Sequence, residues 1–549
     1  MNLSQNVDIA TGLKLPSVGT DYDEVPYPIA TFPLTHPDRS ATIGTLFHLE
    51  VADPNACRVL ELGCASGSNL IPMAVEMPGS QFLGVDLSRV QIADGRKRIE
   101  ALGLGNIRLE KWDILDLADS HKEEVGLFDY IITHGIYSWV PAEVRNAILR
   151  ISSEFLSPNG IASISYNTKP GWCMRGMVRD MMLYHTRKTV APRDRAIGAR
   201  KLVAFLAEHT DDKKAYGQFL RQEAKEMEAW DDAYLLHDAL EATNESFYFH
   251  EFMSDATTHG LQYLGDADLP TMFPSNLPPA AQKELLAAKF DHLKMEQYMD
   301  FIRGRSFRQT LLVHSGRQVN RALETSDVKH FYISALATNE TPDVDLLTNA
   351  AGQYKSLEGR LLSAELPIVK AGMSVLCDQS PLAFGFDTLF AEALQVLARA
   401  WEEKQGTRYE PSELEIQKLR AQFSDALFFG FAQGLIETSI SPSRFTLETD
   451  GLLTASPLAR LEAPLGSKVT NMRHQHGVLD PYSLIVLPLL DGTRNKATVA
   501  TEIVRLLDLG QIDLVKDGRS LREHPDRAQL IAEEMDSMLR KLARVGLLV

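Results

Sequence analysis

Cysteine, long apolar runs and basic charge are all scarce in this 549-residue chain. The longest apolar stretch, Leu484–Leu490, contains a proline and is far shorter than the ~18 residues of a membrane span. The first residues show neither the basic start nor the apolar stretch of a secretory signal. Four cysteines are too few and too scattered for a disulfide framework or a zinc site. The sequence therefore predicts a cytoplasmic protein with reduced thiols, no membrane span and no metal.

Acidic residues outnumber basic ones by 73 to 56, which gives a formal net charge of -17. Because nucleic-acid binding depends on clustered Lys and Arg, this balance argues against a nucleic-acid partner. Solubility alone explains the acidity equally well. The hydrophobic fraction of 44% is typical of globular proteins, and the length suits two to four domains.

One stretch near the N-terminus has the pattern of a ligand-binding turn. The apolar run Val59–Leu62 is followed by Gly63 and Gly67, and a helical pattern begins near Asn69. A strand, a glycine turn and a helix N-terminus together present backbone N–H groups to a nucleotide-like ligand. The next apolar run ends at Asp86, about 20 residues later, where an acid usually accepts hydrogen bonds from ribose hydroxyls.

The spacing within this turn distinguishes between cofactors. A dinucleotide turn has glycine at its first, third and sixth positions, which here are Gly63, Ala65 and Ser68, so NAD and FAD fit poorly. The segment Glu61–Gly67 instead resembles the first motif of class I S-adenosylmethionine-dependent methyltransferases, with Ala65 replacing its middle glycine. The resemblance implies S-adenosyl-L-methionine as cofactor. The residues expected to bind it are Leu62, Gly63, Cys64, Ala65, Ser66, Gly67, Asn69, Asp86, Leu87, Asp113, Ile114, His134 and Tyr22.

Apolar runs that alternate with helical patterns predict a doubly wound, Rossmann-like α/β domain with a parallel sheet. The expected strands are 59–62, 81–86, 107–112, 128–134 and 161–166, and a helix is expected from Pro37 to Val51. A strongly charged helical pattern then fills 173–245. Strand patterns resume at 246–250 and 261–264, and 305–314 is expected to complete the sheet as an edge strand.

These patterns divide the chain into six parts. They are an N-terminal lid or strap (1–50), a cofactor domain (51–172), a helical insertion for dimerisation or as a lid (173–245), the remainder of the catalytic domain (246–320), a middle domain (321–445) and a winged-helix-like C-terminal domain (446–549). The last two each end in an amphipathic helix and a short apolar strand, 413–440 and 530–549. Because Glu533, Glu534 and Asp536 on the last helix would repel phosphate, protein contact or structural support is favoured over DNA binding.

Aromatic and polar side chains gather after the fourth and fifth strands, at the sheet edge where ligands bind. Such a group can form an apolar pocket that desolvates an amine, although core packing is the alternative for each member. His134 and His36 are the candidate proton acceptors. The residues expected at this catalytic pocket are His134, Tyr137, Trp139, Tyr166, Asn167, Trp172 and His36, with Tyr22 and Tyr27 as a roof.

Two further histidines, His474 and His476, lie in the polar segment 466–480. Their spacing admits a metal site. Because no cysteine or carboxylate stands beside them at metal-ligand spacing, the sequence favours a hydrogen-bonded polar loop.

Three segments together, Tyr22–Arg39, Leu60–Pro72 and Tyr166–Trp172, resemble bacterial methyltransferases that carry a methyltransferase regulatory domain. This family includes the rickettsial protein-lysine methyltransferases of outer-membrane protein B. The resemblance implies a homodimer that methylates lysine side chains of a protein, such as a surface or outer-membrane protein. Two alternatives remain open: a small-molecule O- or N-methyltransferase with the same cofactor site, and a non-catalytic interaction protein that senses the cofactor.

Overall fold

The computed structural model describes residues 27, 29–356, 359–516 and 519–549. A seven-stranded sheet forms the centre of its catalytic domain, in the order β3-β2-β1-β4-β5-β7-β6. The strands are β1 (Arg58–Leu62), β2 (Gln81–Val85), β3 (Ile107–Glu110), β4 (Phe128–Thr133), β5 (Leu156–Asn167), β6 (Leu261–Asp266) and β7 (Phe307–His314). Strands β1 to β5 run parallel, and β7 is antiparallel to both β5 and β6. The predicted Rossmann-like fold is confirmed.

The expected position of β7 at the sheet edge is wrong, because β7 pairs on both sides and β6 forms the edge. A strand pattern in the sequence identifies a strand but not its neighbours. The 40 residues between β6 and β7 hold two helices, α13 (Pro279–Ala287) and α14 (His292–Arg303), which lets the chain return between β5 and β6.

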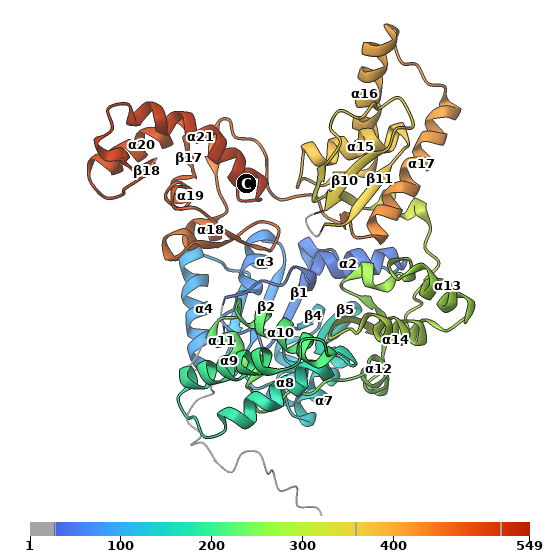
Figure 1. Cartoon of the computed structure of the whole chain (residues 1–549), viewed down its shortest axis with the longest axis vertical. Coiled ribbons are helices and arrows are strands. Elements are labelled where there is room, and N and C mark those ends of the chain that lie inside the picture. Colours follow the sequence, from blue (N-terminus) through green and yellow to red (C-terminus); the bar gives the residue numbers. More distant parts are fainter. Residues whose placement is uncertain (1–26, 28, 357–358, 517–518) are drawn as a thin grey trace, which may run out of the picture.

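Helices cover both faces of the sheet (Figure 1). They are α2 (Pro37–Leu46), α3 (Leu70–Glu76), α4 (Arg89–Leu102), α5 (Ile114–Ser120), α6 (Lys122–Val125), α7 (Ala142–Glu154) and α12 (Phe249–Thr258). Alternation along β1 sends Val59 into one buried core and Leu60 into the other. Helix α2 ends at Leu46, earlier than expected, because the chain turns at His48, whose φ of 58° is left-handed.

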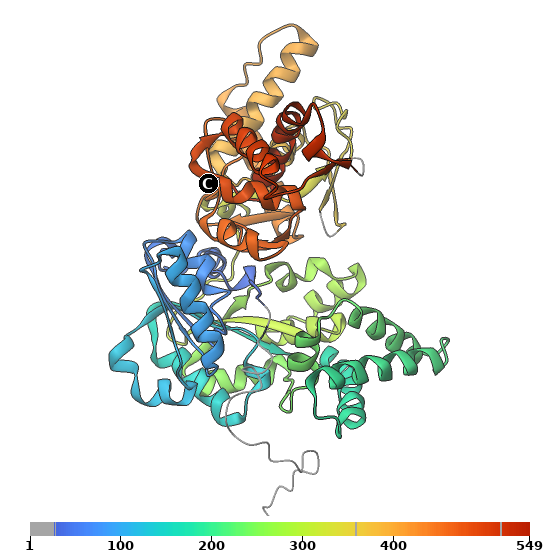
Figure 2. The same ribbon diagram turned by 90° about the vertical axis from the view of Figure 1, so that its left-hand side faces the viewer.

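The helical insertion contains α8 (Gly171–Thr186), α9 (Pro192–His209), α10 (Ala215–Met227) and α11 (Asp232–Tyr234), which continues into a π-helical turn, Leu235–Ala239. It has its own small core and projects from one side of the catalytic domain (Figure 2). The strand expected at 246–250 does not form. Phe247 makes one bridge to Thr168, and α12 then begins, capped by Glu251, which accepts a hydrogen bond from the Tyr248 N–H at 2.8 Å.

The middle domain combines three long helices with two three-stranded sheets, ordered β11-β10-β9 and β12-β8-β13. Its elements are β8 (Tyr332–Ala335), β9 (Ala337–Asn339), β10 (Gly352–Ser356), β11 (Leu361–Ala364), α15 (Pro367–Asp378), β12 (Phe384–Gly385), α16 (Phe386–Gln405), α17 (Glu413–Ala432) and β13 (Ile436–Ser439).

The C-terminal domain is built mainly from short helices and two-stranded sheets. Its elements are β14 (Leu452–Thr454), α18 (Pro457–Glu462), β15 (Lys468–Thr470), β16 (His476–Val478), α19 (Pro481–Val486), β17 (Asp491–Asn495), α20 (Lys496–Asp508), β18 (Val515–Lys516), β19 (Arg519–Ser520) and α21 (Arg527–Arg544). The strand expected after α21 is reduced to one bridge between Leu548 and Ala455.

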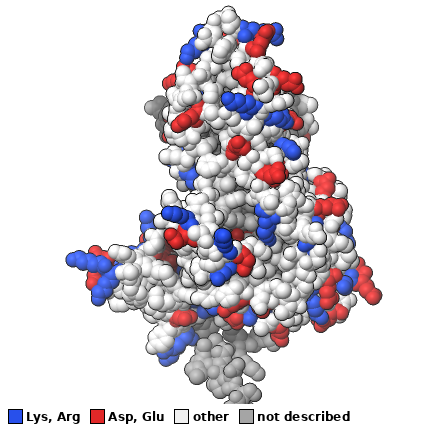
Figure 3. Space-filling model, turned by 90° about the vertical axis from the view of Figure 1, so that its right-hand side faces the viewer, with Lys and Arg blue, Asp and Glu red and all other residues white. Residues whose placement is uncertain are grey.

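The middle and C-terminal domains sit as two lobes on the same side of the catalytic domain, near α2 and α3 (Figure 1). On the face in Figure 3, basic and acidic side chains are interspersed. None of the helices in the described part of the chain is long and apolar enough to cross a membrane.

Candidate active site

The glycine turn after β1 has a left-handed backbone that favours residues without a side chain. Gly63, Ala65 and Gly67 all have positive φ, at 73°, 51° and 70°. A Cβ on Gly63 would meet the Ile136 side chain at 2.3 Å. The left-handed conformation costs Ala65 about 1 kcal/mol, and the turn is held by Asp86, whose carboxylate accepts the Ala65 N–H at 2.9 Å.

A cavity of about 600 Å³ opens at the carboxyl ends of the parallel strands. One part of its wall is the glycine turn and Asp86. Asp113, whose carboxylate caps α5 by accepting the Leu115 N–H at 2.8 Å, lines it beyond β3. The helical insertion closes another part of the wall with Trp172 and Asp238. Segments more than 150 residues apart in sequence therefore share one cavity.

Most of the residues expected at the site line this cavity. They are Gly63, Cys64, Ala65, Asn69, Asp86, Leu87, Asp113, Ile114, His134, Trp139, Asn167, Trp172 and Tyr27. Tyr22 lies outside the described residues. Leu62, Ser66 and Gly67 do not line the cavity: Leu62 belongs to the core beneath it, while Ser66 and Gly67 shape the turn.

Three residues expected at the catalytic pocket lie elsewhere, so the structure corrects their assignment. Tyr137 and Tyr166 are buried in the core against Phe252, with ring centroids at 5.3 and 4.1 Å. Because neighbouring residues of a strand face opposite sides, Asn167 lines the cavity and Tyr166 does not. His36 caps α2 by accepting the Asp38 N–H and is also absent from the cavity wall.

His134 lines the cavity as a neutral imidazole. Its ring lies 3.9 Å from that of Phe32 and 5.8 Å from that of Phe307, and Nδ1 is 3.0 Å from Gln309 Nε2. Burial lowers the pKa of His134 to about 4. His134 is therefore a weak proton acceptor at neutral pH.

Three carboxyl groups in the cavity wall, Glu61, Asp238 and Glu241, were missed by the sequence reasoning. Glu61 is buried in β1, and burial raises its pKa to about 8. Its Oε1 accepts a hydrogen bond from Asn69 Nδ2 at 2.7 Å, whereas its Oε2 has no partner among the described residues. Its position at the start of the methyltransferase motif was the sequence feature that could have identified Glu61 as a site residue. Its orphaned oxygen is suited to a cationic ligand group.

The second missed carboxyl group is Asp238, on the π-helical turn of the insertion. It accepts a hydrogen bond from the Tyr27 hydroxyl at 3.2 Å. Burial raises the pKa of Asp238 to about 7, opposed by the Tyr27 hydrogen bond and supported by the nearby Asp231 carboxylate. No local sequence pattern marks Asp238, because its partner lies 211 residues away.

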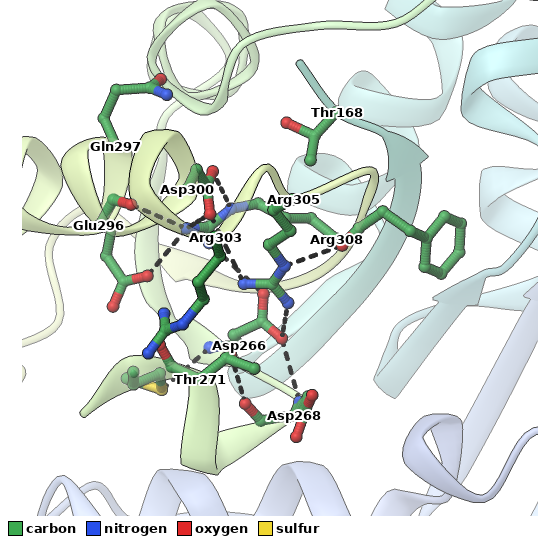
Figure 4. Close-up of polar contacts among 12 residues, drawn as sticks. Thr168, Asp266, Asp268, Thr271, Glu296, Gln297, Asp300, Arg303, Arg305 and Arg308 are labelled. Atoms are coloured by element: carbon green, nitrogen blue, oxygen red, sulfur yellow. Dashed lines mark hydrogen bonds and ion pairs between the residues drawn. The ribbon is translucent and has the colours of Figure 1, made fainter. Parts of the chain in front are cut away.

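A buried ionic cluster, which we call the Arg308 cluster, lies at the start of β7 (Figure 4). Its charged members are Asp266, Glu296, Asp300, Arg305 and Arg308. Arg308 is fully buried, and its guanidinium nitrogens lie 2.8 to 3.4 Å from carboxylate oxygens of β6 and α14. The adjacent residues Ser306 and Phe307 line the cavity, so this cluster sets their position.

Comparison with known proteins supports a methyltransferase of this fold. Family models match residues 60–162 as a methyltransferase domain, 231–314 as a predicted methyltransferase regulatory domain, and 454–547 as the C-terminal winged helix domain of PKMT. The fold, the glycine turn and the cavity thus define a class I S-adenosylmethionine-dependent methyltransferase, and the regulatory domain expected from the sequence is confirmed.

Full-length relatives identify the family. The chain is 35% identical to an uncharacterised protein of Rickettsia prowazekii over 96% of its own length and 93% of that protein. It is 31% identical to PKMT2 of Rickettsia typhi, with a TM-score of 0.82, covering 95% of this chain and 100% of that chain. A further structure shows PKMT2 in complex with AdoHcy, with the same identity and TM-score. The chain belongs to the PKMT, or protein-lysine methyltransferase, family.

Proposed function

We propose that this enzyme transfers methyl groups from S-adenosylmethionine to lysine side chains of a protein, with the cavity holding both reactants. The observation that carries this proposal is the composition of the cavity wall. The glycine turn and Asp86 suit the nucleoside, and the orphaned Glu61 oxygen suits the ammonium group of the methionyl part. The insertion adds Trp172 and Asp238, an aromatic and an acidic group that suit a lysine amine.

S-adenosylmethionine, when bound, supplies an electrophilic methyl group on a positively charged sulfur. The protein must align the amine with it and receive the amine proton. Deprotonating a lysine of ordinary pKa at pH 7 costs roughly 4–5 kcal/mol. Asp238, with a pKa of about 7, is a better acceptor for that proton than His134, with a pKa of about 4. Trp172 and Tyr234 contribute aromatic surface that desolvates the amine and lowers its pKa.

The acceptor class is tested with methyl-deficient cell lysate and radiolabelled S-adenosylmethionine. The label is expected in protein, and mass spectrometry of the labelled bands should locate it on lysine. Label confined to small molecules would overturn the lysine assignment and favour the small-molecule methyltransferase. A surface or outer-membrane protein is the first candidate to look for among the bands.

The role of Asp238 predicts a pH-dependent turnover. Because burial raises its pKa to about 7, the proton-accepting carboxylate forms as pH rises through 7, and wild-type turnover should rise with it. Asp238→Asn should lower turnover about 100-fold and abolish this rise, while S-adenosylhomocysteine affinity stays within about threefold. The matched control is Asp232→Asn, an exposed carboxylate of the same insertion. A D238N enzyme with normal turnover would remove Asp238 from the mechanism.

We also propose that the enzyme is a cytoplasmic homodimer. The insertion exposes large apolar side chains, which supports a protein interface there. They are Met174, Met177, Tyr184, Val190, Ile197, Phe205 and Tyr216. Four unpaired cysteines are in keeping with a reducing compartment. Light scattering should report a dimer, and Phe205→Glu should shift the equilibrium toward monomer. If neither Phe205→Glu nor Tyr184→Glu changes the fraction of dimer, the interface lies elsewhere.

A further inference from the structure

The C-terminal domain reaches the cavity wall through one buried side chain, His474. This residue lies between β15 and β16, has a left-handed φ of 57° and is 2% exposed. Its Nε2 is 2.7 Å from Oδ1 of Asn69. Asn69 precedes α3 and lines the cavity. A residue of the winged-helix domain therefore contacts the wall of the cofactor site directly.

The side-chain amide of Asn69 makes four hydrogen bonds, which is its full capacity. Its Oδ1 accepts the Phe32 N–H at 3.0 Å as well as the bond from His474. Its Nδ2 donates to Thr35 Oγ1 at 3.0 Å and to Glu61 Oε1 at 2.7 Å. Because a backbone N–H is only a donor, Phe32 fixes the orientation of the amide, and His474 must carry its proton on Nε2.

These four bonds join three parts of the molecule at the cavity. The N-terminal strap contributes Phe32, which lines the cavity and packs its ring, tilted, against that of His134. Strand β1 contributes Glu61, whose second oxygen is free of partners among the described residues. The C-terminal domain contributes His474. A shift of the Asn69 amide therefore moves an aromatic wall, a polar wall and a carboxyl group of the cofactor site together.

The turn that carries His474 is itself tied to the catalytic domain. Glu462 of α18 accepts the Thr470 N–H of β15 at 2.7 Å and pairs with Arg98 of α4 at 2.6 Å. Arg473 pairs with Glu437 of the middle domain at 2.6 Å. Helix α18 packs against α3 and α4, as Figure 1 shows. The position of His474 thus reports how the C-terminal domain is docked.

We propose that His474 is a positioning residue of the cofactor site, so that the docked C-terminal domain completes this site and sets its affinity for the cofactor. Anything that displaces the C-terminal domain, including a bound partner, would then weaken cofactor binding. This coupling does not depend on the acceptor being lysine. It also explains why an otherwise polar loop buries an imidazole beside the catalytic domain, where simple interdomain adhesion would be served by apolar side chains.

The test is a comparison of three variants by calorimetry with S-adenosylhomocysteine. His474→Asn is chosen because asparagine tolerates left-handed backbone but is too short to reach Asn69. Its affinity should fall about tenfold. His474→Gln, whose Nε2 replaces the imidazole Nε2, should recover affinity to within about threefold of wild type. The matched control His476→Asn, from the same hairpin and hydrogen-bonded to Thr470, should bind as wild type.

Hydrogen exchange of the wild-type protein gives a second measurement that needs no folded variant. Coupling is reciprocal, so saturating S-adenosylhomocysteine should slow amide exchange in the hairpin 468–478, as well as in the strap at 32–35. Unchanged exchange in the hairpin, or equal affinities for His474→Asn and His476→Asn, would overturn the proposal. Failure to bind S-adenosylhomocysteine at all would instead contradict the cofactor assignment.

Discussion

Two buried polar clusters flank the active site, and they differ in how completely their members pair. In the Arg308 cluster, the guanidinium of Arg308 meets three carboxylates, from Asp266, Glu296 and Asp300. The second, which we call the Asn69 cluster, comprises Asn69, Glu61, Glu76, His36 and His474. Both join segments far apart in the chain. Only the second leaves buried acceptor atoms without hydrogen-bond partners among the described residues.

Four atoms of the Asn69 cluster have no hydrogen-bond partner among the described residues: Glu61 Oε2, Glu76 Oε1, His36 Nε2 and His474 Nδ1. Burial raises the pKa of Glu61 to about 8 and of Glu76 to about 7, and lowers that of His474 to about 3. Near neutral pH, Glu61 and His474 are therefore held mainly in their uncharged forms, whereas Glu76 is about half ionised. A cluster whose charges are neutralised by partners serves as scaffold, whereas one with unused hydrogen-bonding capacity at a cavity is ready for a ligand.

The largest effect is expected from breaking the Arg308 cluster. Arg308→Met leaves the buried Glu296 without its cation and Asp266 and Asp300 with Arg305 alone, which should destabilise the protein by about 3–5 kcal/mol in thermal unfolding. The matched control is Arg408→Ala, because Arg408 pairs with Glu410 at an exposed site, with side chains 81% and 75% accessible. Such a pair contributes roughly 0–1 kcal/mol. If both variants unfold at about the melting temperature of the wild type, the Arg308 cluster does not serve as a structural scaffold.

A smaller effect of opposite sign is expected in the Asn69 cluster. Burial raises the pKa of Glu61 from 4.5 to about 8, so between these values the folded protein binds a proton that the unfolded chain lacks. Wild-type stability therefore falls as pH rises through this window. Glu61→Gln cannot ionise and keeps an acceptor for Asn69. The stability of the ligand-free variant relative to wild type should therefore be about 3–4 kcal/mol higher at pH 8 than at pH 5.

The same Glu61→Gln variant should bind S-adenosylhomocysteine less tightly, because an amide cannot ionise to the carboxylate that a bound ammonium group would favour. Higher stability with lower affinity would separate ligand binding from scaffolding within one residue. Thermal unfolding at pH 5 and pH 8, with and without the ligand, measures both quantities. If the variant is less stable than wild type at both pH values and binds S-adenosylhomocysteine normally, Glu61 has a structural role like that of the Arg308 cluster. The two clusters would then not differ in function.

The expected site residues that line the cavity share a local origin. The turn at Gly63, the strand end at Asp86 and the cap at Asp113 are each defined by a few consecutive residues, and all three line the cavity. The direction in which aromatic side chains point was less predictable from the sequence. Tyr137 and Tyr166 pack into the hydrophobic core, whereas the nearby Trp139 and Trp172 line the cavity. Tyr137 and Trp139 lie two residues apart in one short 3-10 helix, and Trp172 follows β5 at the start of α8, so strand alternation does not decide which of these aromatics faces the cavity.

By itself, the sequence determined the Rossmann-like sheet, the methyltransferase motif and the family, because strand, turn and helix signals act over short distances along the chain. The tertiary structure decided which side chains meet at the cavity. Asp238 approaches Tyr27 across 211 residues, and His474 approaches Asn69 across 405. Such pairs depend on how whole domains dock, which is set by packing of distant surfaces rather than by any local pattern.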